Sequence, residues 1–199
     1  MKIHLRHKLG LGLLAVLLGL AFNISQVHAN TPSIAPPMIQ PEAGKTYFTR
    51  VTFFYEKGVH QATNFSRGES WPINTEVRVN SISDRRGGRF ELERVDTGEK
   101  VTISNIPKHT NIGVQELASR MLADRKTPIE RLPENFQSAI KAGQLRMGMP
   151  KEVAIMARGY PPATHTPSLD ADRWTYQVNR FAVHTIVFSN GVISEGRDL

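Results

Sequence analysis

The sequence predicts an α+β protein in which a small antiparallel β-barrel is followed by a two-layer domain of two helices and three strands. From residue 44 to about residue 107, short apolar–polar alternations are separated by turn residues, which is typical of consecutive antiparallel strands. After Pro128 the apolar spacing becomes helical and then alternates again. The chain has no cysteine, so both parts must be stabilised by burial and not by disulfides.

Residues 1–29 have the pattern of a secretory signal peptide. Three basic residues precede an apolar run over residues 9–22, and a polar stretch then leads to Ala29. A membrane span is the alternative, but 14 residues are fewer than the roughly 20 that cross a bilayer. We expect export to the periplasm. With no cysteine to lipidate, the protein is not expected to be a lipoprotein, and only its binding partners would hold it at the outer membrane.

The charge balance excludes one class of partner. Of the 25 Lys and Arg residues, three precede residue 30, which leaves 22 against 18 Asp and Glu, a net charge of +4. A nucleic-acid-binding protein usually shows a dense basic stripe with interleaved aromatic residues, and this chain does not. We therefore expect no nucleic-acid partner.

The chain before the second domain divides into three segments. Residues 30–43 contain four prolines and predict a flexible, Pro-rich tether. Residues 44–110 predict the barrel, because closure removes the exposed edges of an open sheet. Residues 111–127 predict a connecting amphipathic helix. The apolar positions that support the strands and this helix are Val51, Phe53, Tyr55, Val77, Val79, Phe90, Leu92, Val101, Ile103, Val114, Leu117, Ala118, Met121 and Leu122.

The length and strand count of residues 44–110 resemble a bacterial Src-homology-3-like barrel, with a looser sandwich as the alternative. Turns are expected at residues 86–88 and 96–98, where glycine follows polar residues.

Residues 128–199 predict two helices followed by three strands. The first helix begins near Glu134 and ends at Gly143, and Pro150 suits the first position of the second helix. Gly159 can end that helix in the left-handed conformation. Two alternating strands follow, and the dipeptide at residues 190–191, Asn-Gly, predicts a tight hairpin to a third.

These residues carry a resemblance to a known family. The motifs are Gly148-Met149, Gly159-Tyr160-Pro161, Trp174-Thr175-Tyr176, Phe188 and Asn190-Gly191-Val192, in that order. In order and spacing they resemble the SmpA/OmlA (BamE-like) family of outer-membrane assembly lipoproteins, over about residues 140–193. Arg158 departs from that pattern, which has an apolar residue before the glycine.

The resemblance implies a helix-helix-strand-strand-strand fold, no enzymatic activity, and a scaffolding or binding role in the Gram-negative envelope. It also implies envelope proteins as partners, among them outer-membrane assembly components, and contact with anionic lipid. On this basis residues 128–199 are interpreted as a BamE-like α+β domain with an additional N-terminal barrel.

Two sets of residues are candidates for contact with a partner. Trp174 and Tyr176 are large amphipathic rings that serve equally as core residues or as interface anchors. Tyr160, Pro161, Pro162 and His165 form a semi-rigid loop that could dock a partner or act as a stiff connector.

Arg85, Arg86 and Arg89 form the densest basic cluster after residue 29. Three guanidinium groups on one hairpin could bind phosphate or carboxylate groups, such as those of anionic lipid or peptidoglycan. The alternative is a solvated hairpin tip.

The sequence does not predict an enzyme. His60, His109, His165 and His184 are the histidines after residue 29, and none has the spacing of a metal site. No serine lies in a nucleophile elbow, and we expect no catalytic residue, metal or cofactor. The primary hypothesis is a non-enzymatic periplasmic scaffold that supports outer-membrane assembly or envelope integrity. The alternatives are a peptidoglycan- or anionic-lipid-binding barrel and an inhibitor of a secreted enzyme.

Overall fold

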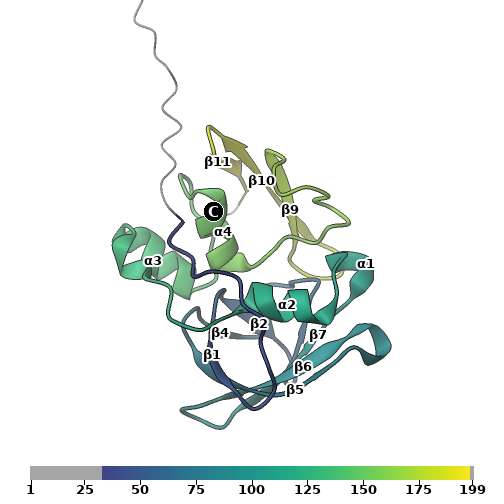
Figure 1. Cartoon of the computed structure of the whole chain (residues 1–199). Coiled ribbons are helices and arrows are strands. Elements are labelled where there is room, and N and C mark those ends of the chain that lie inside the picture. Colours follow the sequence, from purple (N-terminus) through teal and green to yellow (C-terminus); the bar gives the residue numbers. More distant parts are fainter. Residues whose placement is uncertain (1–32, 198–199) are drawn as a thin grey trace, which may run out of the picture. The chain divides into compact units, whose positions relative to one another are not determined.

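The computed structural model describes residues 33–197 (Figure 1). The expected signal peptide and the first three residues of the expected tether lie outside these described residues. The described chain belongs to one compact unit, contains both strands and helices, and is an α+β protein. Within it, no helix is both long enough and apolar enough to cross a membrane.

Six strands form a curled, mixed sheet in the order β3-β7-β6-β5-β1-β8. Figure 1 labels four of them, β1, β5, β6 and β7. Their bounds are Thr46–Thr49 for β1, Val59–Gln61 for β3, Glu76–Ser83 for β5, Arg89–Arg94 for β6, Lys100–Ser104 for β7 and Leu122–Ala123 for β8. The prediction of a closed, wholly antiparallel barrel is wrong in two respects. β3 pairs with β7 in parallel, and β3 and β8 remain unpaired edges of the described sheet.

The expected turns of this region are present. The β5–β6 connection contains a short 3-10 helix, η1 (Arg85–Gly87), and residues 96–98 connect β6 to β7. A separate pair of strands, β2 (Phe53–Tyr55) and β4 (Glu69–Trp71), lies beside the sheet as an antiparallel ribbon. The alternation along β2 buries Phe53 and Tyr55 and leaves Phe54 half-buried on the opposite face.

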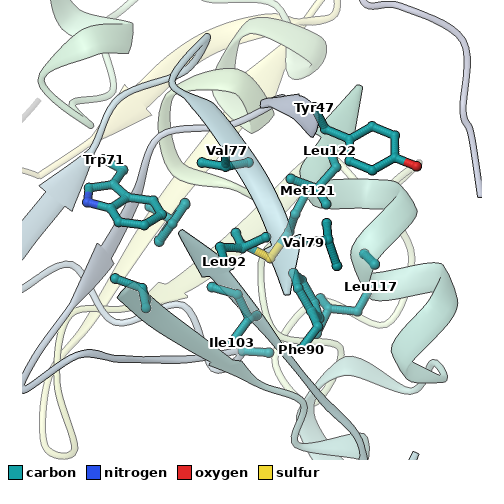
Figure 2. Close-up of a cluster of buried hydrophobic side chains, with 14 of the residues drawn as sticks. Tyr47, Trp71, Val77, Val79, Phe90, Leu92, Ile103, Leu117, Met121 and Leu122 are labelled. Carbon is teal, nitrogen blue, oxygen red and sulfur yellow. The ribbon is translucent and has the colours of Figure 1, made fainter. Parts of the chain in front are cut away.

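One hydrophobic core lies between the curled sheet and helix α2 (Val114–Met121). The helical apolar stripe is confirmed, because Val114, Leu117, Ala118 and Met121 are all buried. Figure 2 shows Leu117 and Met121 pointing from α2 into the cluster around Phe90. Leu122 is equally buried but belongs to β8, so the helix ends earlier than the sequence predicts. A single helical turn, α1 (Pro107–Thr110), precedes α2.

The second core lies between two helices and a three-stranded antiparallel sheet. The helices are α3 (Glu134–Lys141) and α4 (Lys151–Arg158), and the strands are β9 (Arg173–Gln177), β10 (Val183–Ser189) and β11 (Val192–Gly196), in the order β11-β10-β9. A 3-10 turn, η2 (Ile129–Arg131), precedes α3. Gly143 and Asn190-Gly191 have positive φ, as their predicted cap and turn positions require. Gly159 also has a positive φ of 71°, but its ψ of −171° is not that of the predicted left-handed cap. Pro150 is the N-cap of α4, one position before its predicted place.

Thr52 connects the two cores. Its backbone N–H donates to the carbonyl of Met156 at 2.9 Å, and its hydroxyl donates to the carbonyl of Ile140 at 2.6 Å. The same hydroxyl accepts the N–H of Ile73 at 3.0 Å, and the residue is fully buried. This side chain therefore satisfies backbone groups of both halves of the chain.

The segment before β1 differs from the expected flexible tether. Its described part has no regular secondary structure, yet Ile34 and Ala35 pack on the second core and Ile39 packs on the first. The carbonyl of Pro37 accepts a bond of 2.8 Å from the buried Arg50 side chain. An extended, proline-rich chain without internal hydrogen bonds suits such a strap, because it presents its side chains and carbonyl groups to its surroundings.

Candidate binding site

The two predicted aromatic anchors are core residues. Trp174 and Tyr176 are both 0% exposed, and their rings make edge contacts with a centroid separation of 6.5 Å. The hydroxyl of Tyr176 donates to the carbonyl of Gly159 at 3.1 Å. Neither ring is accessible to a partner in this conformation, so the core interpretation is the one that the structure supports.

The predicted docking loop is largely held by the rest of the molecule. Pro161 and Pro162 are buried, Tyr160 is half-buried, and His165 is exposed. Arg120 lies 4.6 Å from the centroid of the Tyr160 ring. The side chain of Asn64 donates to the carbonyl of Tyr160 at 3.1 Å. These contacts agree with a stiff connector, which exposes little beyond His165.

Tyr160 and Pro161 also line a hollow of about 40 Å³ that reaches the first core. This hollow has room for a few water molecules. His60 contributes to its wall, and its Nδ1 lies 2.7 Å from the carbonyl of Phe54, which can only accept. Burial lowers the pKa of His60 to about 4, so the ring is neutral at pH 7 with the proton on Nδ1.

The three arginines of the β5–β6 connection lie on a turn that packs against α2. Arg85, Arg86 and Arg89 are exposed, and within residues 33–197 their guanidinium groups make no hydrogen bond or ion pair. Gly88 has φ of 99°, and a Cβ there would lie 2.7 Å from Cβ of Val114, so the turn packs closely on α2. Arg85 and Arg86 lie in η1 and Arg89 is the first residue of β6, so all three belong to this one hairpin connection.

A larger cleft of about 550 Å³ was missed by the sequence analysis. Its wall includes three phenylalanines and two arginines, namely Phe54, Phe65, Phe181, Arg67 and Arg180. These residues come from β2, from the loop that precedes β4 and from the β9–β10 connection. They share no sequence motif, because segments more than 100 residues apart form the two sides.

The turn that carries Phe181 is ordered by its own hydrogen bonds. The side-chain oxygen of Asn179 accepts the N–H groups of Phe181 at 2.8 Å and Ala182 at 3.0 Å. Val178 donates to the carbonyl of Ala182 at 2.9 Å. Phe181 nevertheless remains 92% exposed. An aromatic ring held in solvent by a structured turn is a feature of binding surfaces rather than of cores.

The opposite wall of the cleft is equally fixed. Gly68 has φ of 87°, and a Cβ there would overlap the carbonyl oxygen of Tyr55, so this loop lies directly against β2. Arg67 pairs with Glu56 at 2.7 Å, with both side chains about half-exposed. Arg180 has no ion pair or hydrogen bond to the described residues. The cleft therefore combines apolar walls with positive charge that is only partly neutralised.

Arg158 lies behind the Phe54 wall. It is only 7% exposed, and its Nε and Nη2 atoms are enclosed without any hydrogen-bond partner in the described chain. Its Cζ lies 5.9 Å from the ring centroid of Phe54 and 5.5 Å from that of Tyr176. Burial lowers the pKa of Arg158. Arg158 is the last residue of α4, where the helix dipole favours a positive charge. The dipole does not supply a hydrogen-bond acceptor for the N–H groups of the guanidinium.

Within the described range, no three His, Cys, Asp or Glu side chains converge in a way that could hold a metal ion. No protein-family model matches the sequence, and neither the curated proteins nor the solved structures contain a significant match. The resemblance to the SmpA/OmlA family therefore remains a hypothesis from the motifs.

Proposed function

We propose that this chain is a non-enzymatic binding protein of the Gram-negative envelope, which recognises another envelope protein through the cleft of Phe54, Phe65 and Phe181. The observation that carries the proposal is Phe181, 92% exposed on an ordered turn at the wall of a 550 Å³ cleft. Exposed aromatic residues beside arginine are enriched where proteins bind proteins.

Two further observations support the envelope setting. The N-terminal pattern of residues 1–29 favours export to the periplasm. The element order α3-α4-β9-β10-β11 is the order that the BamE-like resemblance implies. We infer a scaffold that supports outer-membrane protein assembly or envelope integrity and is held at the outer membrane by what it binds. The curled sheet, whose strand order is not that of a closed barrel, would be an additional module.

A pull-down from Gram-negative envelope extract tests this function. The protein is compared with Phe181→Ser and with Met147→Ser, a matched change at another exposed apolar residue, which is 52% exposed and lies outside the cleft. We expect Phe181→Ser to lose the envelope proteins that the unchanged protein and Met147→Ser recover. Equal recovery by all three proteins would exclude the cleft as the recognition site.

A second candidate function rests on the β5–β6 turn. Arg85, Arg86 and Arg89 place three unpaired guanidinium groups on a turn packed against α2. Such a cluster could bind anionic lipid or peptidoglycan. Binding to vesicles that contain anionic lipid, or to purified peptidoglycan, should then weaken with salt and be lost in the triple alanine variant. Unchanged binding in that variant would remove this candidate.

A further inference from the structure

Arg158 is a buried cation for which the described residues supply no anion. Within residues 33–197 no carboxylate forms an ion pair with Arg158, and its Cζ lies 5.5 Å from the centroid of the Tyr176 ring. An unpaired buried charge normally destabilises a protein, and native structures satisfy nearly all buried donors. Arg158 therefore lowers the stability of the folded protein, because the N–H groups at its enclosed Nε and Nη2 atoms lack acceptors.

The contacts of Arg158 leave its N–H groups available. Rings of Phe54 and Tyr176 lie within 6 Å of its Cζ, which is a favourable arrangement for a cation beside aromatic rings. Such contacts do not satisfy hydrogen-bond donors. The planar fork of a guanidinium matches the two oxygens of a carboxylate, which accepts two parallel bonds from it.

Arg158 is close to the cleft. Phe54 is shared, because its ring contacts Arg158 and also lines the cleft. Tyr176, on the other side, belongs to β9, and the chain continues from this strand to Asn179 and Arg180 of the cleft wall. Arg158 itself does not line the cleft, and it is only 7% exposed. An anion in the cleft would therefore reach the guanidinium by displacing the Phe54 ring, which lies beside Arg158 and forms part of the cleft wall.

We propose that Arg158 binds a carboxylate of the protein partner, while an apolar side chain next to that carboxylate packs on Phe65 and Phe181. This inference rests on the proposed function of the cleft. Charge complementarity supports an acidic segment, since Arg180 is unpaired and the chain after residue 29 has a net charge of +4. An internal acidic segment and a chain terminus are equally suitable, because both present the same carboxylate.

NMR of the arginine Nε–H groups of the whole protein, isolated from the envelope, tests this inference. Arg158→Met identifies the Arg158 signal by its disappearance. The probes are phenylacetate, its neutral analogue phenylacetamide, and inorganic phosphate. We expect phenylacetate to shift the Arg158 signal saturably, and phenylacetamide to leave it in place. Capture of the envelope partner should weaken about tenfold or more in Arg158→Met, the loss expected for one charged hydrogen bond. Arg131→Met, an exposed change outside the cleft, should retain capture.

The other outcomes separate this inference from the proposed function. If phenylacetate shifts signals around Phe181 but not that of Arg158, the carboxylate site is excluded and the cleft remains a binding site. A phosphate shift as large as that of phenylacetate would overturn the assignment to a carboxylate, and would indicate a phosphate-bearing lipid or a free anion. The proposed function itself is contradicted only if Phe181→Ser recovers the same envelope proteins as the unchanged protein in the pull-down.

Discussion

Each of the two cores buries a tryptophan beside a tyrosine, and the polar atoms of these pairs are satisfied differently. Trp71 and Tyr55 pack at 5.8 Å in the first core, and Glu99 accepts from the indole N–H at 3.0 Å and from the Tyr55 hydroxyl. Glu69, 3.1 Å from the same oxygen, is an alternative acceptor for the single hydroxyl proton. Burial and these two carboxylates raise the pKa of Tyr55.

In the second core the indole N–H of Trp174 has no partner in the described chain, and neither do Nε and Nη2 of Arg158. Tyr176 donates to a backbone carbonyl, and burial raises its pKa. The comparison indicates that the Trp71–Tyr55 pair of the first core has acceptors for both of its polar atoms. The second core retains donors that folding leaves unsatisfied, and binding is one use for those of Arg158, whose neighbour Phe54 lines the cleft.

The largest expected effect is the pH dependence that His60 gives to the sheet region. Its pKa is lowered to about 4 from 6.5, so the unfolded chain binds a proton at pH 5 that the folded chain does not. His60 therefore does not lower the free energy of unfolding above pH 6.5, but it lowers this free energy increasingly as the pH decreases towards 4. The total loss is about 3 kcal/mol, because each tenfold difference in proton affinity between the folded and unfolded chain corresponds to about 1.4 kcal/mol.

Urea denaturation between pH 4 and 7.5 measures this loss, with His60→Gln and the exposed change His165→Gln as the matched pair. His60→Gln should flatten the profile over this range, and His165→Gln should not. If the free energy of unfolding changes with pH equally in His60→Gln and in the unchanged protein, the His60 ring binds its proton as readily in the folded protein as in the unfolded chain.

The second effect is the cost of breaking the satisfied network of the first core. Glu99→Ala should lower the free energy of unfolding by about 2 kcal/mol, because the Trp71 N–H loses its acceptor and Tyr55 loses one of two. Glu116→Ala removes an exposed pair with Arg120 and should change it by about 0.5 kcal/mol or less. Similar losses for both variants would show that the network contributes nothing beyond a surface contact.

The third effect has the opposite sign and concerns the unsatisfied cation. Arg158→Met should raise the free energy of unfolding by about 1 kcal/mol, since a long apolar side chain replaces a charge without a counter-ion. Arg131→Met is the control and should stay within about 0.5 kcal/mol of the unchanged protein. A loss of stability in Arg158→Met alone would indicate that the guanidinium is satisfied within the folded protein.

Local features of the fold could be predicted from the sequence. The alternations at Val77 and Val79, the helical stripe of α2 and the Asn190-Gly191 turn depend on neighbouring residues, and the structure contains all three. The parallel pairing of β3 with β7 could not be predicted, because it joins strands about 40 residues apart without a turn to set their register.

The candidate site depended even more on distant contacts. Arg85, Arg86 and Arg89 are adjacent in sequence and were therefore recognised, whereas Phe54, Phe65 and Phe181 meet only in the folded chain. The departure at Arg158 was visible from the resemblance, but its burial was not. One signal was present, since Phe181 directly follows Asn179 and Arg180 in a short connection between two strands, where a large aromatic residue is unusual.

Photo-crosslinking in a Gram-negative periplasm tests the central claim most directly. A photoreactive amino acid replaces Phe181 in one protein and Met147 in the other, since both side chains are exposed and only the first lines the cleft. We predict discrete crosslinks to envelope proteins from position 181, and none of these products from position 147. Identical products from both positions, or no product from position 181, would contradict the assignment of the cleft as the recognition surface.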